Sequence, residues 1–208
     1  MSTNLDALDI VNSACAEIGA DPLQDLEEET IGGEAAALVY ASVVDFNLSI
    51  EPFEFKFEIR ALSQVADATP LSGYTYLFDI PGPRLGPPRW LSHDLTDSDC
   101  NYTQYRLIKG QVHAMDEQLF ASVPFRPDPI NWEPAFRKAT ITALAAHLAT
   151  ALASDVKTRD RLLLQAYGTP QEQNRGGEMR NAIQNNAQVT PPVTAGWDNN
   201  PLTKSWLS

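Results

Sequence analysis

Carboxylates supply the first residues in this sequence whose types and spacing could do chemistry. Asp25 is followed closely by Glu27, Glu28 and Glu29 in the segment "DPLQDLEEET". Carboxylate oxygens at this spacing could bind a divalent cation, or two of them could divide the acid and base roles of sugar hydrolysis. Consecutive acids in a loop are usually solvated, so we expect neither a metal site nor a catalytic pair here.

The histidines and cysteines form no catalytic or metal-binding motif. His93, His113 and His147 are isolated in the sequence, and His147 is expected at a helix contact. Cys15 and Cys100 lack the short spacing of a zinc or redox pair, and Cys15 falls on an apolar helix face where it should pack. Nucleotide-binding, metalloprotease and serine-hydrolase motifs do not occur. We therefore expect no enzyme, no cofactor and no metal.

Negative charge is concentrated at the start of the chain. The formal net charge is −12, and residues 1–55 hold twelve of the 27 acids with no Lys or Arg. Such a distribution argues against binding nucleic acid by phosphate neutralisation, which needs a basic surface. Two interpretations stay open. The acids form a solvated face, or they line a passage that repels DNA, with Asp25, Glu27, Glu28 and Glu29 as the candidates.

The first fifty residues have the pattern of two helices. Apolar residues recur at helical spacing over residues 4–18, and Gly19 stands where a left-handed cap belongs. A second helix is predicted over residues 33–48, ending before Pro52. Its apolar residues leave little polar surface, so we expect burial on more than one side. No stretch reaches the roughly 18 apolar residues of a membrane span.

The last third of the chain is also predicted to be helical. A third helix begins with Asn131 as its N-cap and Pro134 in its first turn. A fourth begins near Lys157, is interrupted between Gly168 and Gly177, and resumes in the segment "EMRNAIQNNA".

The middle of the chain has short apolar or aromatic runs broken by Pro and Gly. Tyr74 to Ile80 reads as a strand, and two more strands flank a turn at Lys109 and Gly110. The segment "LFASVPF" follows as a further apolar run, and "PGPRLGPP" is predicted to be a rigid loop. These signals predict a small antiparallel sheet.

Together the elements predict a mainly α fold of the α+β class. It is an antiparallel helical bundle with an inserted small antiparallel β-sheet and an extended C-terminal arm. One domain covers residues 1–187, with a helical core at 4–50 and 131–187 and the β insertion at 53–130. Residues 188–208 have no periodicity and contain Pro-Pro and Asn-Asn-Pro, so they should not fold alone.

Four large apolar residues in the arm suggest a role for it. They are Trp197, Leu202, Trp206 and Leu207. Such side chains are costly to leave in water, and aromatic residues are typical interface anchors. We expect the arm to become ordered on a partner, and the alternative is a tail without a role.

The third helix carries alanines where a surface helix would carry charges. At about 100° per residue, one side forms a core stripe with Ile141, Leu144, Ala145, Leu148 and Leu152. The far side holds Ala139, Ala143, Ala146, Thr150 and Ala153. Small residues there let a second body approach closely. That body is either another helix of the same chain or a neighbouring subunit.

The order of these pieces resembles the head-to-tail connector, or adaptor, family of tailed bacteriophages. The matching features are a helix ending in "IG", a long helix leading through "FEF" into "RAL", the strand "YTYLFDI", a short hairpin, and "WEPAF" before the alanine-rich helix. They cover roughly residues 5–187. The family includes the tail tubular protein A type and the connectors of gene transfer agents. The chain departs from it at Phe53 and Phe55, where members usually have Trp, and in the interruption after Gly168.

The resemblance implies a structural virion protein rather than an enzyme. Family members form a ring, typically of twelve copies, that lies beneath the portal and joins the DNA-filled head to the stopper or tail. The arm would dock on the portal, the alanine face would contact the next subunit, and the acids would face double-stranded DNA that passes without specific binding. The protein would assemble in the host cytoplasm, away from membranes, and end at the head–tail interface of the virion.

Two other functions stay open. One is a tail-associated enzyme that degrades the cell wall, which would need paired carboxylates with shifted pKa values. The other is a non-viral helical adaptor that binds one protein partner.

Overall fold

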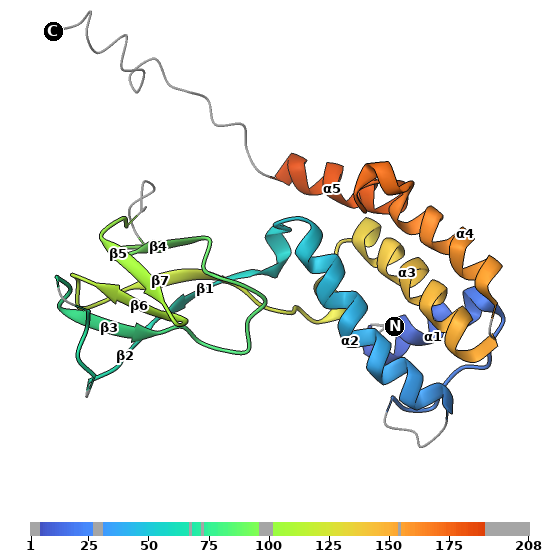
Figure 1. Cartoon of the computed structure of the whole chain (residues 1–208), viewed down its shortest axis with the longest axis horizontal. Coiled ribbons are helices and arrows are strands. Elements are labelled where there is room, and N and C mark those ends of the chain that lie inside the picture. Colours follow the sequence, from blue (N-terminus) through green and yellow to red (C-terminus); the bar gives the residue numbers. More distant parts are fainter. Residues whose placement is uncertain are drawn as a thin grey trace, which may run out of the picture.

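A computed structural model describes most of the chain. The described residues are 5–26, 31–66, 68–71, 73–95, 102–153 and 155–189. The molecule has a helical part and a β part, which lie beside each other and are joined by two crossings of the chain (Figure 1).

Five α-helices occur in the described part of the chain. They are α1 (Ala7–Ile18), α2 (Ile31–Ile50), α3 (Pro134–Ala153), α4 (Val156–Tyr167) and α5 (Gly177–Val189). Helix α3 packs against each of the other four, so it is the centre of the helical part (Figure 1). A central helix is covered by its neighbours on most sides, which explains why α3 carries small and apolar residues around most of its circumference and is exposed along a strip that includes His147 and Ala151.

The helix ends follow local signals in the sequence. Helix α1 begins after Asp6, whose carboxylate accepts a hydrogen bond from the Asp9 amide at 2.9 Å. The Asp9 carboxylate accepts from the Asp6 amide in return, at 3.1 Å, which completes a capping box. Gly19 has φ 70° and caps the other end, as predicted.

The predictions for the later helices were correct in outline and wrong at one start. Helix α3 begins at Pro134, but Asn131 is the last residue of a 3₁₀ turn (η2, Pro129–Asn131) and does not cap it. Helix α4 begins after Asp155, whose carboxylate accepts from the Thr158 amide at 3.0 Å. Gly168, at φ 76°, ends α4, and a 3₁₀ turn (η3, Pro170–Glu172) precedes α5.

Helix α2 differs from the prediction in its burial. Val43 and Val44 are buried, whereas Leu38 is 78% exposed and Phe46 is 43% exposed. The helix therefore buries one face and leaves apolar residues on the other. Its contact with α3 and α4 includes a buried polar cluster of Asn47, Thr140 and Tyr167, in which the Tyr167 hydroxyl donates to Asn47 Oδ1 at 2.6 Å.

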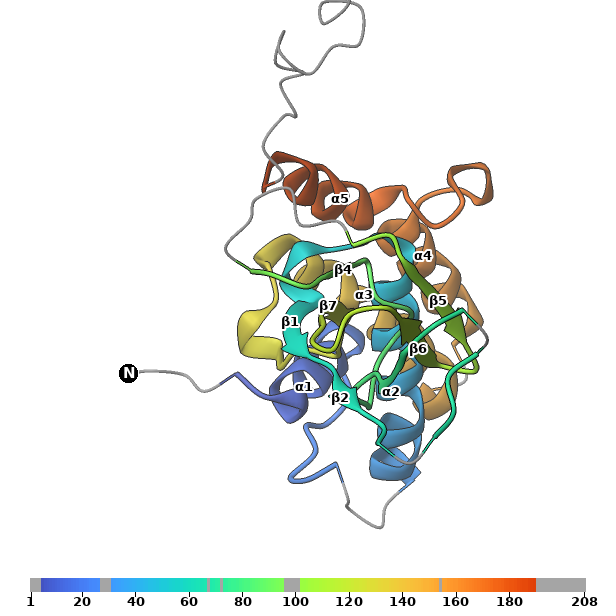
Figure 2. The same ribbon diagram turned by 90° about the vertical axis from the view of Figure 1, so that its left-hand side faces the viewer.

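The described part of the β region contains seven strands in two antiparallel sheets. The strands are β1 (Phe57–Ala61), β2 (Ser63–Gln64), β3 (Tyr76–Asp79), β4 (Trp90–Ser92), β5 (Tyr105–Ile108), β6 (Gln111–Ala114) and β7 (Phe120–Pro124). One sheet has the order β1-β7-β4 and the other the order β2-β3-β6-β5. Figure 2 looks onto this part of the molecule with the helices behind it.

The two sheets enclose a hydrophobic core of their own. Leu91 and Val123 from one sheet and Phe78 and Val112 from the other belong to a single buried cluster. The strand predictions at Tyr74 to Ile80, on both sides of Lys109-Gly110 and in "LFASVPF" are confirmed by β3, β5, β6 and β7.

The predicted fold class is wrong. The chain is not a mainly α bundle with a small inserted sheet, but an α+β protein whose described residues include seven strands in two sheets around a separate core. The pattern underestimated the β part because β4 has only three residues and β1 exposes four of its five, so neither alternates clearly.

Candidate functional site at the junction of the two parts

An aromatic cluster lies where the chain crosses between the helical part and the β part. Phe53 and Phe55 belong to the outgoing crossing, and Trp132 and Phe136 to the returning one. The ring of Phe136 is 4.9 Å from Phe53, 5.1 Å from Phe55 and 5.4 Å from Trp132, measured between centroids. Edge-to-face packing at these distances adds to the energy of burial. The cluster joins the two crossings into one unit.

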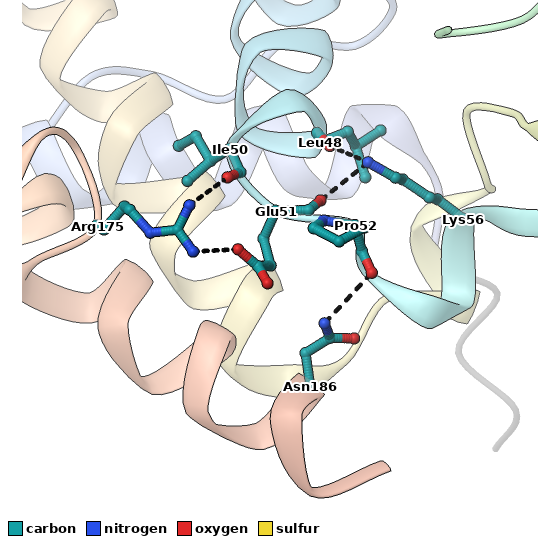
Figure 3. Close-up of polar contacts among 7 residues, drawn as sticks. All are labelled: Leu48, Ile50, Glu51, Pro52, Lys56, Arg175 and Asn186. Carbon is teal, nitrogen blue, oxygen red and sulfur yellow. Dashed lines mark hydrogen bonds and ion pairs between the residues drawn. The ribbon is translucent and has the colours of Figure 1, made fainter. Parts of the chain in front are cut away.

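A buried lysine closes the end of α2 at this junction (Figure 3). Lys56 Nζ donates hydrogen bonds to the carbonyl oxygens of Leu48 at 2.5 Å and Glu51 at 2.9 Å. The last carbonyls of a helix have no partner within it, and the helix dipole favours a positive charge there. Lys56 is 8% exposed, and this burial lowers the pKa of its ammonium group. Lys56 therefore supplies hydrogen bonds to two backbone carbonyls at the end of α2, which is a structural role.

Helix α5 and the loop just before it hold the same crossing from the other side (Figure 3). Arg175 donates to the carbonyl oxygen of Ile50 at 3.0 Å and forms an ion pair with Glu51. Asn186, which is 5% exposed, donates to the carbonyl oxygen of Pro52 at 3.3 Å. The Asn186 amide oxygen also accepts a hydrogen bond from the backbone amide of Glu54, at 2.9 Å. Residues 50–56 are therefore fixed by both α2 and α5.

A cleft opens beside this joint, between α2, β1 and the Pro-rich loop. We call it the junction cleft. Its volume is about 520 Å³, and its charged and aromatic lining consists of Asp45, Glu58, Arg60, Arg84, Phe125 and Arg126. Three guanidinium groups thus meet two carboxylates. The loop "PGPRLGPP" contributes to the wall, and its Leu85 amide donates to the Pro124 carbonyl oxygen at 2.9 Å.

The arginines of the junction cleft differ in their partners. Arg126 forms two bonds with Asp45, at 2.8 and 2.5 Å, and these raise the pKa of its guanidinium. Arg60 donates two hydrogen bonds to Glu58, at 3.0 and 2.6 Å. Within the described residues, Arg84 donates only to backbone carbonyl oxygens. They belong to Ile80, at 3.2 Å, and to Gly110, at 3.5 Å.

The alanine face of α3 is occupied by the chain itself. Ala139, Ala143 and Ala146 are 0% exposed and belong to the helical core, so they have no surface to offer a neighbouring subunit. This corrects the subunit-contact prediction at these three positions in favour of an intrachain helix contact. Thr150 is half-buried on the same helix, and Ala153 is its last residue.

Other residues singled out in the sequence are not gathered at the junction. Asp25 is exposed after α1. Glu27, Glu28 and Glu29 lie outside the described residues, as do the four arm residues Trp197, Leu202, Trp206 and Leu207.

His113 and Cys15 have the surroundings of structural residues. His113 is 9% exposed, and its Nδ1 accepts a hydrogen bond from the Leu71 amide at 3.0 Å. His147 is exposed on α3. Cys15 packs in the helical core, as predicted, and burial raises the pKa of its thiol. Across the described ranges, no three or more His, Cys, Asp or Glu residues are placed to hold a metal ion.

The polar residues that build the junction were missed in the sequence, whereas its aromatic residues belong to the motifs "FEF" and "WEPAF". One signal was available, because Lys56 is the first base after 55 residues without one and stands between aromatic residues in "FEFKF". Arg175, Asn186 and the cleft arginines have no such local signal, since only the tertiary fold brings them to the crossing.

Two further findings complete the description of this chain. In the part of the chain that the structure describes, none of the helices combines the length and apolar character that a membrane span needs. A scan against protein-family models gave no match, and neither did a search of curated proteins.

Proposed function

We propose that this chain is the head-to-tail adaptor of a tailed bacteriophage or of a related particle. Copies of it would form a ring beneath the portal, join the DNA-filled head to the stopper or tail, and surround the passage for DNA. The chain would act by assembly and not by turnover.

The observation that carries the proposal is the aromatic cluster at the junction. The resemblance to the adaptor family depends in part on "FEF" and "WEPAF", which are far apart in the sequence. Phe53 and Phe55 from the first and Trp132 and Phe136 from the second pack ring to ring. Both motifs therefore serve one purpose, the joint between two parts of the molecule, which supports a shared structural origin for them.

The construction of the joint also suits an adaptor. A protein that links two assemblies must hold its two binding surfaces in a fixed relation. Lys56, Arg175 and Asn186 bind backbone oxygens of the crossing between the β part and the helical part. Because Arg175 lies just before α5, Asn186 lies within it and the arm follows it directly, a partner on the arm would be coupled to the joint.

Binding to the portal tests the proposal. The full chain is mixed with the portal protein encoded in the same genome, and the mass of the complex is measured by native mass spectrometry. We expect several copies per portal, up to the twelve of the family. The control is a deletion of residues 190–208, which begins after α5 because that helix extends to Val189.

A second control tests whether portal binding needs the large apolar side chains of the arm or only its length. Replacing Trp197, Leu202, Trp206 and Leu207 by Ser keeps the length of the arm and removes its anchors. Both variants should lose portal binding while keeping the helical circular dichroism of the full chain. Absence of any complex with the full chain, or equal binding by the deletion, would overturn the proposal.

The acids have a separate test in assembled particles. We expect that replacing Asp25, Glu27, Glu28 and Glu29 by their amides changes DNA retention or ejection, because a repulsive lining becomes neutral. Unchanged infectivity and DNA content would show that these acids only keep the surface solvated.

A further inference from the structure

The junction cleft contains a positive charge that the described residues do not neutralise. Arg126 pairs with Asp45 and Arg60 pairs with Glu58, each through two hydrogen bonds. Arg84 forms no ion pair within the described ranges. Its donors point to two backbone carbonyl oxygens, which satisfy hydrogen bonds but carry no full charge. The cleft therefore has the composition of a site that is one anion short.

The guanidinium groups of the cleft are held in place before any anion arrives. Arg60 lies over the ring of Phe125, with its guanidinium carbon 4.1 Å from the centroid. Arg84 Nη2 lies 2.8 Å from where a side chain at Gly110 would begin, so the glycine leaves the space that Arg84 occupies. A planar guanidinium that is already positioned binds a carboxylate through two parallel bonds at low entropic cost.

The chain itself supplies unpaired carboxylates. Asp21 and Glu34 are exposed at the two ends of the connection between α1 and α2, and neither forms an ion pair with the described residues. Residues 1–55 contain no Lys or Arg, so these two acids have no basic neighbour close to them in the sequence. Glu34 is eleven helical residues from Asp45 in the cleft, which corresponds to roughly 16 Å along α2 at 1.5 Å per residue. Glu34 therefore lies near the opposite end of α2 from the cleft of its own copy.

We propose that the junction cleft receives Asp21 and Glu34 of a second copy of this chain. The contact joins two different surfaces, so it repeats from copy to copy and closes into a ring if the rotation closes. The inference rests on the proposed adaptor function. It provides the subunit contact that the buried alanine face of α3 cannot provide.

A charge exchange between two full-length variants tests this contact. The first variant is Arg84→Glu, and the second is Asp21→Lys with Glu34→Lys. Alone, each variant sets like charges against each other across the contact. In an equimolar mixture, the acidic cleft of the first meets the basic connection of the second, and the original attraction remains in the other direction. The variants should therefore associate with each other and not with themselves.

Sedimentation equilibrium measures the association at low and at high salt. We expect weak self-association of the unaltered chain that declines with salt, because exposed charges are screened. Each variant alone should associate roughly tenfold less tightly, since reversing one partner turns attraction into repulsion. The mixture should recover the unaltered affinity. Arg106→Glu is the matched control, because Arg106 is exposed on β5, away from the cleft lining, and should change little.

Several outcomes would overturn the contact. They are an unaltered chain without salt-dependent association, a folded variant that associates as tightly as the unaltered chain, and a mixture that stays monomeric although circular dichroism shows both variants folded. The portal assay separates this inference from the proposed function. Charge-exchange association without portal binding would refute the adaptor and keep the contact, whereas full occupancy of the portal by Arg84→Glu would refute the contact and keep the adaptor.

Discussion

Replacing Lys56 by Met should lower the free energy of unfolding by about 1–3 kcal/mol. The ammonium group donates to two backbone carbonyls at the end of α2, at 2.5 and 2.9 Å, and the residue is only 8% exposed. Each hydrogen bond from a charged donor contributes about 1.5–3 kcal/mol. Relief of the ammonium desolvation offsets part of this loss, and the apolar stem of Met fills a similar volume. The net effect should therefore be smaller than the sum of two bonds.

Urea unfolding followed by circular dichroism at neutral pH gives this value. The matched control is Lys138→Met, because Lys138 pairs with Glu17 on the surface and its side chain is 52% exposed. An exposed pair of this kind contributes less than about 1 kcal/mol. Equal midpoints for the two variants would refute the role assigned to Lys56.

The pH dependence provides an independent check on the same residue. Burial lowers the pKa of Lys56 below its ordinary value of 10.5. The folded state then binds fewer protons than the unfolded state between the lowered pKa and 10.5, so the stability contributed at this position rises with pH across that interval. The difference in unfolding free energy between the unaltered chain and Lys56→Met removes the contributions of other groups. A difference that stays flat or falls as the pH rises toward 10.5 would contradict the burial of a charged lysine.

Three further changes test the packing of the helices and of the hairpin. Tyr167→Phe removes a buried donor and should cost about 1–2 kcal/mol in urea unfolding. Because burial raises the pKa of Tyr167, the unaltered chain should also lose stability as the pH rises above the ordinary 10.0, and a phenylalanine variant with the same pH profile would contradict this. Gly110→Ala should cost about 1 kcal/mol in thermal unfolding, since φ is 82° and the new methyl meets Arg84, and an unchanged midpoint would argue against the turn geometry. Ala143→Leu should cost about 1–3 kcal/mol by overpacking, whereas Ala151→Leu on the exposed side of α3 should cost little, and equal costs would contradict the central place of α3.

Features that one or two residues impose were predictable from the sequence. Gly19 ends α1, and Lys109 and Gly110 form the turn between β5 and β6 with φ of 51° and 82°. Such positions need a backbone conformation that few residues adopt, so the signal is local. The strands β1 and β4 were missed because their pairing with β7 is a long-range property. Ile59 on β1 is 55% exposed, which removes the alternation that a half-buried strand would show.

The candidate site was less predictable than the fold. Periodicity divided α3 into two faces but could not tell what covers the alanine face, because an intrachain helix and a neighbouring subunit favour the same small residues. The burial of Ala139 and Ala143 follows from four helices packing around one, and that arrangement depends on the whole helical part. In the same way, Arg175 just before α5 and Asn186 within it have the pattern of surface residues, and only the tertiary fold brings them to the crossing.

The position of the joint connects the two proposals. Arg175 and Asn186 tie α5 to the crossing, and Asp45 of α2 belongs to the junction cleft beside it. A portal that holds the arm after α5 and a second copy that inserts acids beside Arg84 would therefore act on neighbouring parts of one joint. Each contact would reduce the freedom of the joint, and the second would then form at a lower entropic cost. The ring would therefore form cooperatively on the portal, whereas the free chain would associate weakly.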